Sequence, residues 1–161
     1  MCRIALVLLF LSSVPAGSSG QSLTQVGVID VPGPKGQRFD YLTMDDEDHY
    51  LLSGGNHTFT VVALDSQRAL AHFPLPAGAD VVKYDSGLHR AYAACASGFI
   101  SIVQEDDPAH FHKLEDFPVQ KLVHSLAVDA ATHRLCVPEQ HKDGKPVARI
   151  MIYAPVNPAS P

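Results

Sequence analysis

The chain has 161 residues and a formal net charge of −5, and its 12 Lys and Arg residues are scattered along the sequence. This length suits one ordinary domain. The dispersed, mildly acidic charge argues against nucleic-acid binding, which needs a basic patch. No later segment approaches the ~20 apolar residues of a membrane-spanning helix, so we expect no membrane span.

The chain begins with the organisation of a secretory signal peptide. Arg3 precedes an apolar run at residues 4–11, and small and polar residues follow. The run is too short to span a membrane, and cleavage after Ala16 or Gly20 would follow a small residue. A buried N-terminal element is the alternative. We expect residues 1–20 to be removed and the mature protein to be periplasmic or secreted.

Residues 21–161 are expected to form one domain of short strands separated by turns. Apolar and polar residues alternate in short segments, with Gly, Pro, Asn and Asp between them, which is typical of strands and hairpins. In chain order we expect strands at residues 24–31, 38–44, 50–53, 58–64, 69–73, 80–84, 89–94, 99–104, 111–117, 123–128, 134–137 and 148–153.

The pattern Asp-x-x-x-His occurs three times in this domain, and successive copies are 40 and 44 residues apart. The copies are Asp45 with His49, Asp85 with His89, and Asp129 with His133. A strand-filled repeat of about 40–45 residues is typical of a propeller blade. We therefore predict an all-β fold, a partial β-propeller of about three four-stranded blades, at about residues 36–75, 79–118 and 122–154.

The third repeat is one strand short, and the segment at residues 24–31 is spare. In propellers the N-terminal strand often completes the last blade, so we expect residues 24–31 to pair with residues 148–153 of this chain or another. Propellers have about four to eight blades, so three blades do not close. Either blades are missing or partners complete the ring, which predicts self-association.

The repeated Asp and His residues are interpreted as turn residues. Asp side chains bond nearby backbone and suit turns. A shared metal site is the alternative, but equivalent turns on different blades lie too far apart for one ion. No metal site is assigned.

Three further polar residues stand five positions before the repeated Asp: Asp40, Asp80 and His124. That position begins the innermost strand of each blade, at the mouth of the central channel. These side chains are the candidate binding residues, because carboxylates and an imidazole can hold a cation or a polar ligand, or exchange protons. The alternative is that they bond to the backbone of the neighbouring blade, since a buried carboxylate needs partners.

Three segments resemble the secreted YVTN/YncE-like β-propeller proteins. They are Gly-Gln-Arg-Phe-Asp-Tyr-Leu-Thr-Met-Asp at 36–45, the stretch with Leu-Ala-Val-Asp and Thr-His-Arg-Leu at 123–137, and residues 98–111. The resemblance implies a seven-bladed ancestor of about twice this length. The first blade would be joined here to the last two, with a seam near residues 70–79.

The sequence contains no Gly-x-Ser-x-Gly, Cys-x-x-Cys-His, His-Glu-x-x-His or P-loop motif, so no catalytic residue and no cofactor is assigned. The first hypothesis is an exported binding or scaffold module of the cell envelope with an unknown ligand or partner. The second is a propeller enzyme of the lactonase or dehydrogenase type that uses a cation at the channel mouth. The third is an inactive product of internal deletion.

Overall fold

The computed structural model describes residues 23, 25–33, 39–55 and 57–156, and within these ranges the chain forms eleven strands and no helix. The strands are β1 (Phe39–Asp45), β2 (Tyr50–Gly55), β3 (Thr58–Ala63), β4 (Arg68–Pro74), β5 (Ala79–Asp85), β6 (Arg90–Cys95), β7 (Phe99–Asp107), β8 (His110–Pro118), β9 (Ala127–Asp129), β10 (Arg134–Lys142) and β11 (Lys145–Tyr153). The predicted signal peptide, residues 1–20, lies outside the described residues. No helix of the described part has the length and apolar character needed to cross a membrane.

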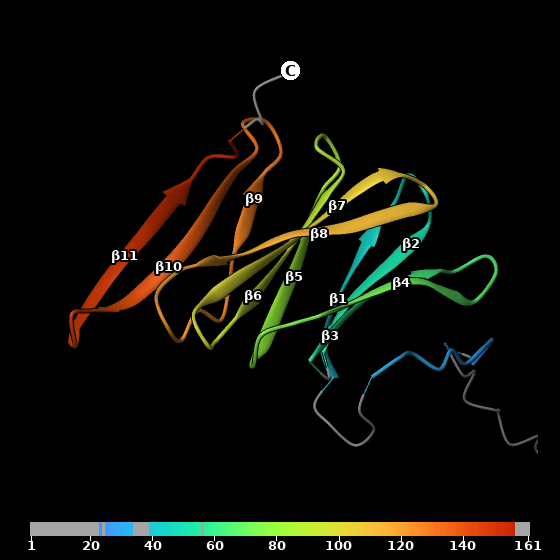
Figure 1. The fold of residues 1–161 in the computed structure, drawn as a ribbon, viewed down its shortest axis with the longest axis horizontal. Coiled ribbons are helices and arrows are strands. Elements are labelled where there is room, and N and C mark those ends of the chain that lie inside the picture. Colours follow the sequence, from blue (N-terminus) through green and yellow to red (C-terminus); the bar gives the residue numbers. More distant parts are fainter. Residues whose placement is uncertain (1–22, 24, 34–38, 56, 157–161) are drawn as a thin grey trace, which may run out of the picture.

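The strands form three antiparallel sheets (Figure 1). The first sheet has the order β1-β2-β3-β4, the second β5-β6-β7-β8, and the third β11-β10-β9. The inner strands meet, because β1 contacts β5 and β5 contacts β9. In Figure 1 the second sheet stands between the other two. This is the arrangement of successive propeller blades, and it confirms the prediction of an all-β partial propeller.

Two apolar cores hold the sheets together, one on each face of the second sheet. In β6, Ala91 and Ala93 pack in the core shared with the first sheet, whereas Tyr92 and Ala94 pack in the core shared with the third. Successive side chains of a strand point to opposite faces, so a sheet covered on both sides needs an unbroken apolar run. The sequence Arg-Ala-Tyr-Ala-Ala-Cys of β6 provides one.

The N-terminal segment does not complete the third sheet. Residues 25–33 form no strand, and the third sheet has three strands with β11 at its end. The expectation that residues 24–31 pair with β11 is therefore wrong within one chain. The physical reason is the open array, which puts the segment preceding β1 beside the first sheet, where Gly27 lies against Gln67, while β11 lies at the far end (Figure 1).

The repeated Asp residues all accept hydrogen bonds from their own turns. Asp45 Oδ1 accepts from the N–H of Glu47 at 3.1 Å, and Asp129 Oδ1 from that of Ala131 at 3.1 Å. The His that ends each turn has a left-handed backbone, with φ of 56°, 48° and 58° at residues 49, 89 and 133. His is one of the few residues enriched there, which accounts for its place in the repeat.

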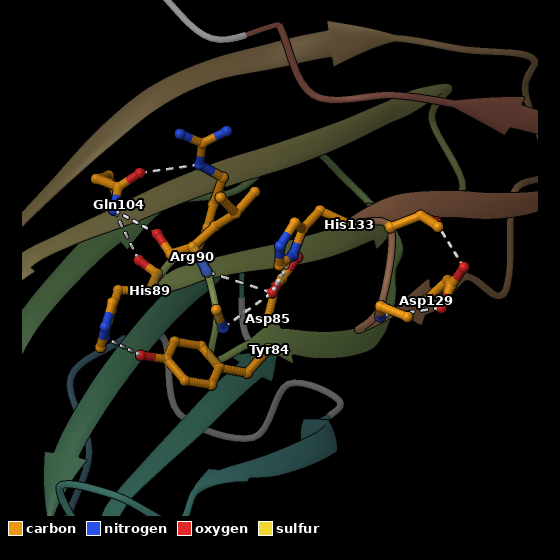
Figure 2. Close-up of polar contacts among 11 residues, drawn as sticks. Tyr84, Asp85, His89, Arg90, Gln104, Asp129 and His133 are labelled. Atoms are coloured by element: carbon orange, nitrogen blue, oxygen red, sulfur yellow. Dashed lines mark hydrogen bonds and ion pairs between the residues drawn. The ribbon is translucent and has the colours of Figure 1, made fainter.

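One of these His residues also links two sheets (Figure 2). His133 Nδ1, from the turn after β9, lies 3.0 Å from both carboxylate oxygens of Asp85 at the end of β5. The Asp85 side chain is fully buried and also accepts hydrogen bonds from the N–H groups of Gly87 and Leu88. A buried carboxylate of the second sheet thus depends on a donor from the third.

We expect His133→Ala to lower the free energy of unfolding by roughly 1–3 kcal/mol, because it leaves the buried Asp85 carboxylate short of a donor. His89→Ala is the matched control: its backbone is also left-handed, so the strain of Ala there cancels in the comparison, and its ring contacts a hydroxyl, that of Tyr84. Urea unfolding at neutral pH measures both. Equal losses of unfolding free energy in the two variants would contradict a stabilising contact between His133 and Asp85.

Candidate functional site

The structure brings together two of the three residues expected at the channel mouth. His124 Nδ1 lies 2.7 Å from Asp80 Oδ2. Asp80 stands at the start of β5, and His124 precedes β9 on the third sheet. Asp40 lies in β1 at the equivalent position, but its side chain is outside what the structure describes. An imidazole and a carboxylate in contact can bind a polar group or exchange a proton, and here they also connect the second sheet to the third.

A second polar cluster, which we call the acidic cluster, lies between the first and second sheets. It consists of Asp45 at the end of β1, Asp48 in the following turn, and Glu105 on β7. One carboxylate oxygen from each residue lies within 4.8 Å of the other two. Asp45 is 1% exposed and Glu105 5% exposed, so two of the three carboxylates are removed from water.

The hydrogen bonds of the acidic cluster are incomplete. Asp45 Oδ1 accepts the hydrogen bond of its turn, and Glu105 Oε2 accepts a hydrogen bond from the Tyr84 hydroxyl. Asp45 Oδ2 and Glu105 Oε1 are buried and have no partner among the described residues. The Tyr84 hydroxyl in turn lies 3.4 Å from His89 Nδ1, as Figure 2 shows. Buried carboxylate oxygens without partners are costly.

The surroundings of Glu105 raise the pKa of its carboxyl group. Burial is the largest cause, and the negative charges of Asp45 and Asp48 act in the same direction; the hydrogen bond from Tyr84 and the charge of His89 oppose them. Burial, followed by the hydrogen bond and charge of Glu105, raises the pKa of Tyr84 as well. The cluster is therefore short of positive charge.

A cavity of about 290 Å³ opens beside the acidic cluster. Five carboxylates and one imidazole are among the residues that line it: Glu47, Asp48, Glu105, Asp106, Asp107 and His89. Two of these carboxylates have histidine partners, since His112 Nδ1 lies 2.6 Å from Asp106 and His110 Nδ1 lies 2.8 Å from Asp107. A cavity of this composition suits a small cation rather than an anion.

A larger cavity, of about 490 Å³, lies between the second and third sheets. Its walls include Tyr92, Ile102 and Phe117 of the second sheet and Leu135 and Tyr153 of the third. The rings of Phe117 and Tyr153 meet edge to face with centroids 5.3 Å apart. Arg90 and Glu115 also line this cavity, but most of its walls are apolar and suit side chains of another segment.

The acidic cluster was not expected from the sequence. Asp45 was interpreted as a turn residue, and Asp48 and Glu105 were not singled out. The strand pairing aligns Glu105 with Leu64 of the first repeat, because Arg90 pairs with Gln104 as Tyr50 pairs with Ala63. A carboxylate at a position that another repeat fills with Leu is the signal that could have identified Glu105.

Comparison with known proteins supports the fold. No protein-family model matches the chain, and no curated protein does. Among solved structures, a candidate 6-phosphogluconolactonase from Bacteroides uniformis superposes with a TM-score of 0.57 at 13% identity, over 81% of this chain and 42% of that one. The β-propeller domain of Cps50 (Swd1) from Myceliophteria thermophila gives 0.53 at 9% identity, over 73% and 44%.

A chain of the mitotic checkpoint complex also superposes, with a TM-score of 0.54 at 10% identity, over 62% of this chain and 32% of that one. The chain thus spans less than half the length of each of these three structures. Identities this low carry the fold and not the activity, so membership of the YVTN/YncE-like family stays a prediction. Within the described residues, the chain is an array of three β-propeller blades, the third with three strands.

Proposed function

We propose that this chain is an exported binding or scaffold module of the cell envelope, which works by self-association rather than by catalysis. The observation that supports this most directly is the unfinished third sheet. Its strand β11 has no neighbour on its outer side among the described residues, and the larger cavity lies beside it.

The edge of β11 is a site for strand addition. An edge strand presents unpaired backbone N–H and C=O groups, and an extended segment of another chain can pair with them. The second sheet has a fourth strand, β8, at the equivalent place. A strand added to β11 would lie opposite β8 and direct alternate side chains toward Phe117 and Tyr153 in the cavity.

The occupant we propose is segment 24–31 of a second copy. Val26 is 91% exposed and Val28 72% exposed. These side chains therefore contribute little to the stability of their own chain. They alternate along the segment and would enter the cavity together. Because the segment starts beside the first sheet of its own chain, two copies that exchange segments would place their blades in one ring.

Exposed apolar side chains on the innermost strand of the first sheet and on β11 of the third support the same proposal. Ile150 and Ile152 of β11 are 58% and 63% exposed. Strand pairing places Leu42 and Met44 of β1 on the face of the first sheet opposite its core, because they pair with Ser53 and Leu51. Leu42 and Met44 are also exposed. In a longer array the next blade would cover such side chains.

We expect the mature protein to form dimers or larger assemblies, and Val28→Asp to weaken this association by at least about tenfold, because a charge would have to enter an apolar cavity. Gln25→Asp is the matched control, since it adds the same charge to the opposite face of the segment. Light scattering across a concentration series measures the association. A folded wild-type monomer at tens of micromolar would contradict the proposal.

Export is tested separately. The apolar run at residues 4–11 and the small residues that follow predict cleavage by a signal peptidase. Mass spectrometry of the protein recovered from its native host should find a new N-terminus between residues 17 and 22. Protein that retains Met1 in the cytoplasm would contradict export and leave the association to be judged by light scattering alone.

A further inference from the structure

The two junctions between sheets satisfy equivalent carboxylates differently. Between the second and third sheets, the buried Asp85 receives Nδ1 of His133 at 3.0 Å. Between the first and second sheets, Asp45 stands in the position of Asp85, and His89 in that of His133. The His89 ring contacts the Tyr84 hydroxyl at 3.4 Å, and Asp45 Oδ2 is left without a partner in the described part of the chain.

A second buried carboxylate adds another unpaired acceptor between the first and second sheets. Glu105 is buried next to Asp45, and its Oε1 also lacks a partner among the described residues. Asp48 adds a third carboxylate from the turn. At the junction between the second and third sheets, His133 provides a donor. The junction between the first and second sheets has three carboxylates instead, and two of them have buried oxygens without a partner in the described residues. The arrangement is satisfied when a positively charged group occupies the space.

We propose that a calcium ion binds between the first and second sheets, with Asp45, Asp48 and Glu105 as its protein ligands. The cluster offers oxygen only, which is what hard divalent cations prefer. Calcium–oxygen distances of about 2.3–2.6 Å place ligands on opposite sides of the ion about 5 Å apart, and the three oxygens lie within 4.8 Å of one another. The adjoining cavity of about 290 Å³ admits the waters that complete the coordination.

The ion would also link two blades. Asp45 and Asp48 belong to the first sheet and Glu105 to the second, so calcium would stabilise this junction as His133 stabilises the next. Tyr84 would hold Glu105 in place through its bond to Oε2, as outer partners of metal ligands commonly do. All three ligands come from one chain, so the site does not depend on self-association.

Terbium luminescence and calcium titration test the site on the purified mature protein. The chain has no Trp, so emission excited in the ultraviolet reports a lanthanide close to tyrosine, and Tyr84 is bonded to Glu105. We expect terbium emission that calcium displaces, and calorimetric calcium binding that Asp45→Asn or Glu105→Gln weakens by at least about tenfold.

Asp129→Asn is the matched control, because it removes the same charge from the equivalent turn of the third sheet and should leave calcium affinity unchanged. Thermal unfolding in chelator separates lost binding from lost folding: both cluster variants should unfold at or above the wild-type temperature, since each removes a buried negative charge. The absence of calcium binding by folded wild-type protein, or an equal loss in the control, would overturn the proposal.

Saturating calcium should raise the unfolding temperature of the wild type by roughly 5–15 °C at about a hundred times the dissociation constant. A calcium effect of the same size in Glu105→Gln would contradict ligation by Glu105.

Discussion

The stacking of one sheet face on the next is the constraint on which this molecule depends. A blade has two apolar faces and can bury both only between neighbours. The second sheet meets this requirement, with Ala93 on one side and Tyr92 on the other in separate cores. The first and third sheets have one described neighbour each, which explains why Ile150 and Ile152 of β11 are exposed.

The same stacking determines the chemistry of the turns. Each turn starts with an Asp that accepts backbone N–H groups, and covering that turn with the next sheet buries the carboxylate. Asp85 and Asp45 are both buried, whereas Asp129, which is not covered in this way, is exposed. A buried carboxylate needs a counterpart, so each junction is stabilised by whatever its neighbour contributes: an imidazole in one case and, in our proposal, an ion in the other.

The fold was largely predictable from the sequence because the signals that define it are local. Hairpin turns, alternation and the repeated Asp and His are read within a few residues, and they predicted the eleven strands of the three sheets. The innermost strand of the third sheet is the least accurate, since β9 is limited to Ala127–Asp129 where residues 123–128 were expected. The strand expected at residues 24–31 failed because pairing depends on which elements meet in space. Apolar and polar residues do alternate in this segment, but within one chain the segment does not reach the edge of β11 in the open array.

The two candidate sites also differ in how well the sequence predicts them. The proximity of Asp80 and His124 follows from their equivalent positions in the repeat, so the sequence was enough to place them together. The acidic cluster joins two repeats at positions that are not equivalent, the end of β1 and a site late in β7. Glu105 meets Asp45 because the second sheet stacks on the first, and the repeated Asp and His positions do not include Glu105.

The N-terminal segment lies at one end of the array of sheets and the edge of β11 at the other, so the two ends of the array differ. In the proposed assembly, one end of the chain would provide the added segment and the other the acceptor edge, so contact between copies would be heterologous in kind. Whether such contacts close after two copies or continue depends on the rotation from one blade to the next, since a rotation that fails to close produces an open filament. The angle between adjacent sheets, which affects neither end directly, would therefore decide between a discrete ring and a fibre.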